Sequence, residues 1–196
     1  MDAPEQDPLV RLGGWLFKQR SWLPIPIVVA LVALPMDAQH PLALWGGVLL
    51  VASGQGIRLW AVHHIGVISR TRSERLGPLI STGPFAHVRN PLYLGNIALW
   101  LGFTVSAGLL WLAPLVLLML GVEYHAIVRW EEGLLTTRIG ESYRSYLTRV
   151  PRWIPSWQSG ATETITGAYS WRDTLFSERS TLIAVAIGYL ILWFKA

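Results

Sequence analysis

Long stretches without a charged side chain constrain this chain more than any other feature. The uncharged runs are 15 to 33 residues long and cover residues 21–36, 38–57, 90–122 and 180–194. A helix that crosses a membrane needs about 20 successive apolar residues. The sequence therefore predicts an all-α integral membrane protein, with residues 1–196 forming a single membrane domain.

The run of 33 residues is too long for one membrane span. As a single helix it would measure about 50 Å, against a hydrocarbon core of about 30 Å. We expect the chain to break at Ser106-Ala107-Gly108 and to form a tight helical hairpin over residues 91–128. With the other runs this gives about five transmembrane helices: two spans in 1–69, a core in 70–155, and a loop and last span in 156–196. The short first and last runs are expected to borrow flanking aromatic or polar residues, or to tilt little.

The basic residues predict the orientation. Of the 16 Lys and Arg residues, 15 lie in four segments, 11–20, 58–89, 129–152 and 172–179. Five spans put all four segments on one side, which the positive-inside rule makes the cytoplasm. We therefore expect a bacterial inner-membrane protein whose N-terminus and active site face the cytoplasm. The net charge of +4 then reflects topology, and no nucleic-acid partner is predicted.

No metal site is predicted. The chain has no cysteine, which excludes a thiolate zinc site and a cysteine nucleophile. The adjacent His63 and His64 would point about 100° apart on a helix, so they cannot chelate one ion well.

The first candidate functional stretch is residues 77–96, GPLISTGPFAHVRNPLYLGN. Pro91 suits the first turn of a helix, which makes Asn90 the expected N-cap, with its side chain accepting a backbone N–H. A helix N-terminus beside Arg89 could hold a carboxylate or a phosphate. The plainer interpretation, in which Arg89 only anchors the membrane boundary and Asn90 only caps, is equally consistent with this stretch.

The second candidate stretch is residues 129–155, which predict a cytoplasmic amphipathic helix that ends near Val150, before Pro151. Glu131 and Glu132 follow directly from the fourth span. A carboxylate at the membrane boundary is costly unless it is paired, so it is a functional candidate. Taken alone, the residues favour surface charges paired with nearby arginines.

The order of the two stretches is more specific than either motif. Arg-x-Pro-x-Tyr-x-Gly at 89–95 precedes the hairpin, and Glu-Glu at 131–132 precedes Gly-x-x-Tyr-x-x-Tyr-x-x-Arg-Val-Pro at 140–151. Over about residues 70–155 this pattern resembles the isoprenylcysteine carboxyl methyltransferase family and the wider group of integral-membrane phospholipid methyltransferases.

The resemblance implies S-adenosylmethionine as the cofactor. It implies catalytic roles for Arg89, at the reacting end of the site, and for Glu131. The cofactor-binding residues that it implies are Gly77, Pro78, Leu79, Ile80, Phe85, Asn90, Pro91, Leu92, Tyr93, Glu131 and Glu132.

The chain departs from the family pattern at three positions. Phe85 stands where the family usually has tyrosine, and Asn90 replaces the usual histidine. The Asn90 side chain can form hydrogen bonds but cannot transfer a proton. Ile127 occupies the position of a substrate-contacting arginine of the eukaryotic enzymes. Arg129 lies about 200° further round a helix, so it is no simple replacement. A prenylcysteine substrate therefore does not follow from the resemblance.

The predicted function is methyl transfer from S-adenosylmethionine to a lipophilic acceptor in the membrane. The acceptor group is left open between a prenylated thiol carboxylate, a phospholipid amine and a small isoprenoid, and the oligomeric state is also open. Two alternatives are an NADPH-dependent reductase or isomerase of a lipid ring, and a non-catalytic membrane carrier or assembly protein.

Overall fold

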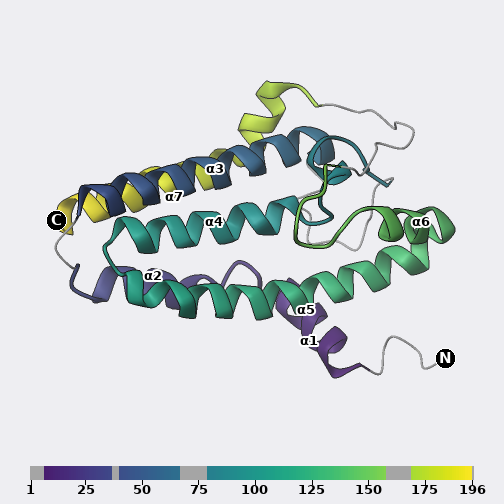
Figure 1. Ribbon diagram of the computed structural model, residues 1–196, viewed down its shortest axis with the longest axis horizontal. Helices are drawn as coiled ribbons and strands as arrows, with labels where there is room; N and C mark the ends of the chain where they lie inside the picture. Colours follow the sequence, from purple (N-terminus) through teal and green to yellow (C-terminus); the bar gives the residue numbers. More distant parts are fainter. Residues whose placement is uncertain (1–6, 37–39, 67–78, 158–168, 196) are drawn as a thin grey trace.

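The computed structural model describes residues 7–36, 40–66, 79–157 and 169–195, and within these ranges every regular element is a helix (Figure 1). Two sequence-predicted cofactor residues, Gly77 and Pro78, lie outside the described residues, as does most of the predicted loop at 156–170. The described elements are α1 (Pro8–Gln19), α2 (Ile25–Ala33), α3 (Pro41–Ile65), the 3-10 turn η3 (Gly83–Ala86), α4 (Pro91–Ser106), the 3-10 turn η4 (Leu110–Leu112), α5 (Ala113–Ile139), α6 (Glu141–Arg149) and α7 (Trp171–Lys195).

Three segments of the described chain are long and apolar enough to cross a membrane: Pro41–Ile65, Leu110–Ile139 and Trp171–Lys195. The last of these starts nine residues before the uncharged run at 180–194, so it borrows flanking residues as predicted. The structure thus shows an all-helical membrane protein, while the count of five spans stays a prediction.

The predicted hairpin is present. Helix α4 ends at Ser106, the chain turns at Gly108 with a φ of 76°, and η4 leads into α5. A φ of this sign is readily adopted only by glycine, which explains why the turn falls here.

The surface helix differs from its prediction at its start. Helix α5 continues without a break from Ala113 to Ile139, so Glu131 and Glu132 belong to the long helix. Only the nine residues of α6 form a separate helix, after Gly140 with a φ of 73°. Helix α6 ends at Arg149, with Val150 in extended conformation before Pro151, as the sequence predicts.

The first uncharged run does not form one long helix. Proline in the first turn of α2 sets its start at Ile25, and α2 ends after nine residues, before Pro35. Contacts nevertheless place α1 and α2 along the length of the bundle. Asp7 pairs with Arg129 of α5 at 2.9 Å at one end, and the Lys195 ammonium of α7 donates to the Leu31 carbonyl at 2.5 Å at the other.

Helix α4 lies between α3 and α5, with α7 beside α3 (Figure 1). Facing glycines bring the backbones of α3 and α4 close together. A Cβ atom added to Gly54 would lie 2.6 Å from the Gly95 carbonyl oxygen, and one added to Gly47 would lie 2.5 Å from that of Gly102. The start of α4, the ends of α3 and α5, and all of α6 gather at one end of the bundle. Both candidate stretches meet there.

Candidate active site

Arg89 lies just before α4 and joins that helix to the end of α6. Its Nε donates to the Val150 carbonyl at 2.6 Å, its Nη2 donates to the Leu147 carbonyl, and its Nη1 donates to Glu132 Oε1 at 2.9 Å. The last carbonyls of a helix have no partner within the helix, so a guanidinium is a suitable donor for them. All three nitrogens of Arg89 are therefore engaged by the protein.

Glu132 is held by two arginines. Besides Arg89, Arg152 donates from Nε to Oε1 at 3.0 Å and from Nη2 to Oε2 at 2.6 Å. The hydrogen bond to Glu132 raises the pKa of Arg152 above its ordinary value. The Glu132 side chain is only 11% exposed. This ion-paired triad of Arg89, Glu132 and Arg152, hereafter the arginine clamp, ties α5 to the segment that follows α6.

Glu131 lies beside the clamp but has a different environment. It is partly exposed, and its Oε2 accepts a hydrogen bond from the Tyr93 hydroxyl of α4 at 3.1 Å. The Tyr93 ring packs on the Tyr124 ring with centroids 4.8 Å apart. A carboxylate beside two aromatic rings offers a place for a positively charged group.

A further positive charge at this place comes from the N-terminal segment. The Arg20 guanidinium lies 4.3 Å from the centroid of the Phe17 ring, and its charge acts on both Glu131 and Tyr93. The Phe17 ring in turn packs on Trp130 at 4.9 Å. Arg20 and Arg152 were not predicted as site residues, because a run of basic residues carries no signal for the one that lies near a carboxylate in the folded chain.

The expected capping role of Asn90 is wrong. Asn90 occupies the N-cap position and α4 starts at Pro91 as predicted, but the Asn90 side chain makes no capping hydrogen bond. Its amide instead donates to the Arg152 carbonyl at 3.1 Å. The backbone amides in the first turn of α4, which includes Leu92 and Tyr93, therefore donate no hydrogen bond to the Asn90 side chain.

The remaining predicted cofactor residues lie around α6. Leu79 and Ile80 precede η3 and are partly buried, and Leu79 packs against a cluster of Tyr143, Tyr146 and Val150. Phe85 is buried, and its carbonyl accepts a hydrogen bond from the Tyr146 hydroxyl at 2.8 Å. Burial raises the pKa of Tyr143 and of Tyr146 above the ordinary range, so both side chains act as neutral packing groups.

A second polar cluster, which was not predicted from the sequence, lies deeper in the bundle. Arg58 of α3 binds Glu178 of α7 through Nε and Nη2, at 3.0 and 2.8 Å, and donates from Nη1 to Asn96 of α4 at 2.6 Å. A signal was present, because Arg58 interrupts an otherwise uncharged stretch from Ala38 to Ser69.

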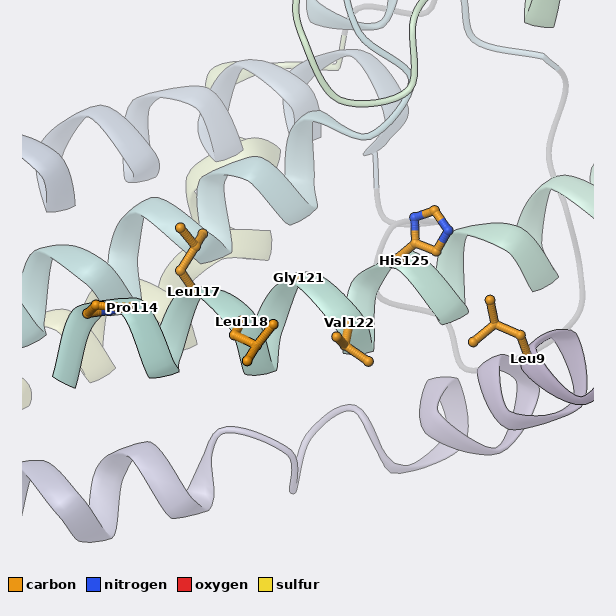
Figure 2. A pocket seen from close by; sticks show the side chains of 7 residues that line it. All are labelled: Leu9, Pro114, Leu117, Leu118, Gly121, Val122 and His125. Atoms are coloured by element: carbon orange, nitrogen blue, oxygen red, sulfur yellow. The ribbon is translucent and has the colours of Figure 1, made fainter.

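An apolar groove of about 590 Å³ runs along α5 on another face. Figure 2 shows its lining side chains, which come from α5 except for one from α1: Leu9, Pro114, Leu117, Leu118, Gly121, Val122 and His125. The groove shares no residue with the arginine clamp or with Glu131. Its apolar lining is typical of a surface in contact with lipid.

The described residues hold no group of three or more His, Asp or Glu side chains arranged for a metal ion. His63 instead stacks on Trp171 with ring centroids 4.1 Å apart, and its Nδ1 lies 3.3 Å from the Thr174 hydroxyl. His64 Nδ1 lies 2.9 Å from the Trp60 carbonyl oxygen, and the His64 ring packs edge-on against the His63 ring with centroids 5.5 Å apart.

The long apolar helices, with the polar cluster at one end of the bundle, are those of an integral membrane protein. Residues 42–142, about half of the chain, match the phospholipid methyltransferase family. The chain therefore belongs to this family of membrane methyltransferases, the wider group that its motifs resemble.

Two curated relatives share weaker similarity. The nickel-cobalt-cadmium resistance protein NccN of Alcaligenes xylosoxydans xylosoxydans is 30% identical over 109 residues, which cover 56% of this chain and 48% of NccN. The cobalt-zinc-cadmium resistance protein CzcN of Cupriavidus metallidurans is 28% identical over 115 residues, 59% of this chain and 50% of CzcN. The chain thus spans about half the length of the curated relatives it matches. No solved structure matches the chain significantly.

Proposed function

We propose that the chain transfers a methyl group from S-adenosylmethionine to a lipophilic acceptor in the membrane. The observation that carries this proposal is Glu131, a partly exposed carboxylate held by Tyr93 beside the arginine clamp, in the segment that matches the family. S-adenosylmethionine would supply an electrophilic methyl group on a sulfonium sulfur.

The residues at this end of the bundle fit that cofactor. Glu131 would bind the ammonium group, and the rings of Tyr93 and Tyr124 would face the positive sulfonium. The first-turn amides of α4, which the Asn90 side chain leaves uncapped, would donate hydrogen bonds to the carboxylate of the cofactor. Leu79, Ile80 and Phe85 would line the site from the segment before α4, while Gly77 and Pro78 stay predictions from the sequence.

Arg89 and Glu132 would organise the site from within the arginine clamp. Because all three Arg89 nitrogens already donate inside the protein, we assign Arg89 the task of holding the start of α4 against the end of α6. Methyl transfer by in-line displacement depends mainly on such positioning. The expectation that Arg89 itself binds a ligand carboxylate stays a prediction.

The proposed topology has five spans in one membrane domain, and the first crossing is the uncharged run at 21–36, which contains α2. The basic segments would face the cytoplasm of a bacterial cell, as the positive-inside rule implies. The soluble cofactor would then enter from the cytoplasm, and the acceptor from the bilayer.

Calorimetry on the full chain in detergent tests the function. We expect S-adenosylhomocysteine to bind the wild type and Glu131→Ala to weaken binding by about tenfold or more, because a hydrogen bond to a charged group contributes about 1.5–3 kcal/mol. Glu141→Ala is the matched control, since Glu141 is exposed on α6 and its nearest arginine lies 3.7 Å away. The proposal fails if the wild type does not bind S-adenosylhomocysteine, and binding of NADPH in its place would favour the reductase alternative.

A further inference from the structure

Helix α7 lies outside the segment that matches the family, yet it places a carboxylate inside the bundle. Its buried residues are Thr174, Ser177, Glu178 and Leu192. Three of the four are polar, and all three lie in the half of α7 nearest the candidate active site. Helix α7 therefore joins the other helices there mainly through polar groups.

The central contact is the pair of Arg58 and Glu178. The Glu178 side chain is fully buried and the Arg58 side chain is 13% exposed, with both carboxylate oxygens bound by the guanidinium. Gln55 adds a longer hydrogen bond from Nε2 to Glu178 at 3.4 Å. Charged groups at membrane depth are costly, and a buried ion pair is often no more stabilising than apolar residues of the same volume. A contribution to stability alone does not account for this pair.

The pair is connected to Glu131 by an unbroken series of contacts. Arg58 Nη1 donates to Asn96 Oδ1 at 2.6 Å, and the Asn96 side chain also interacts with the Tyr124 side chain. The Tyr124 ring packs on Tyr93, whose hydroxyl donates to Glu131 at 3.1 Å.

The close packing of α3 and α4 makes this series possible. The Arg58 stem passes over Gly95, where an added Cβ atom would lie 2.6 Å from Arg58 Cγ. A larger residue at position 95 would push the stem away, so Gly95 gives the guanidinium its path to Asn96.

We propose that Arg58 and Glu178 are a positioning pair which, through Asn96 and Tyr124, fixes Tyr93 and so sets the geometry of the Glu131 carboxylate. The inference rests on the proposed function, because it takes Glu131 as a cofactor-binding group. It gives α7 a role in the active site in addition to its role as a membrane anchor.

The test compares two variants that each remove a polar group of the series from Arg58 to Glu131 with a control variant that removes a hydrogen bond between α7 and α4 far from the site. Tyr124→Phe and Asn96→Ala each interrupt the series. Tyr189→Phe removes a hydrogen bond of 3.1 Å from α7 to Ser106 at the far end of α4, and is the matched control. The measurement is the Kd of S-adenosylhomocysteine, by calorimetry on the full chain in detergent, together with the Tm of each variant.

We expect Tyr124→Phe and Asn96→Ala to raise the Kd by about threefold to tenfold, the range for one hydrogen bond, and Tyr189→Phe to leave it within about twofold at a similar change in Tm. Unchanged Kd values in both Tyr124→Phe and Asn96→Ala, or an equal rise of the Kd in Tyr189→Phe, would overturn the inference while leaving the proposed function intact. Absence of binding to the wild type would overturn the proposed function and this inference with it.

A double-mutant cycle tests the pair itself. Glu178→Gln keeps the side-chain shape but removes the charge that holds Arg58. We expect its effect on the Kd to be smaller in the presence of Asn96→Ala than alone, because both act through the same contacts. Strictly additive effects would show that Glu178 and Asn96 act independently, and would overturn the positioning role.

Discussion

Two neighbouring glutamates on α5 have different environments, and the proposed function gives them different roles. Glu132 is almost buried and is bound by Arg89 and Arg152. Glu131 is partly exposed and accepts one hydrogen bond from Tyr93. Adjacent positions on a helix point about 100° apart, so one carboxylate turns toward the segment after α6 and the other toward α4.

Glu132→Gln should destabilise the protein strongly. The change leaves two arginines without their carboxylate, and removing one partner of a buried ion pair costs about 3–5 kcal/mol. Thermal unfolding in detergent should therefore show a clear fall in Tm. Glu141→Gln is the control, because the exposed Glu141–Arg144 pair should contribute about 0–1 kcal/mol. Equal Tm values for the two variants would show that the arginine clamp does not support the fold.

The packing of α3 on α4 depends on glycines that face each other seven residues apart. Gly47 and Gly54 of α3 meet Gly102 and Gly95 of α4, and the two backbones approach within contact distance at both places. Small residues allow this approach in membrane helices, where dispersion contacts replace the hydrophobic effect as the main source of association.

Gly54→Ala should separate α3 from α4, since its Cβ atom would lie 2.6 Å from the Gly95 carbonyl oxygen. Overpacking of this kind costs about 1–3 kcal/mol. Gly56→Ala, two residues further on the same helix, meets nothing within 4 Å and should be neutral or slightly stabilising because alanine favours helix. The measurement is the Tm of both variants in detergent, and a fall in Tm for Gly56→Ala as large as for Gly54→Ala would contradict this account.

The whole molecule has its basic segments toward one end. The pairing of Asp7 with Arg129 brings the start of α1 to the end that holds the arginine clamp, while Lys195 lies beside α2 at the opposite end. Figure 1 shows the same arrangement, with the described start of the chain and α6 toward one end and the C-terminus at the other. This geometry agrees with an odd number of crossings.

Cysteine labelling tests the topology, and the natural chain has no cysteine to interfere. Single cysteines at the exposed positions Lys18, Ser145 and Leu110 would mark α1, α6 and the hairpin turn. A membrane-impermeant maleimide should label Lys18→Cys and Ser145→Cys from the cytoplasmic side of vesicles, and Leu110→Cys from the other side. Labelling of Lys18→Cys and Ser145→Cys from opposite sides would contradict the five-span topology.

Much of the fold follows from local patterns. The hairpin turn at Ser106–Gly108, the start of α4 at Pro91 and the end of α6 before Pro151 were all predictable, because proline and glycine restrict the backbone locally. The short α2 and the long unbroken α5 were not predicted, since uncharged runs give the extent of apolar sequence but not where a helix ends. The membrane methyltransferase family was predictable from the order of the motifs.

The sequence by itself determined the helical membrane class, the hairpin and the family, because hydropathy, charge and backbone restriction act over neighbouring residues. Only the tertiary structure decided that Glu132 is ion-paired with the arginines while Glu131 stays partly exposed. It also decided that Asn90 donates to the Arg152 carbonyl and does not cap α4. It also brought Arg58 and Glu178, 120 residues apart, into contact inside the bundle. Such pairings depend on how helices from distant parts of the chain pack, and no local pattern of residues specifies them.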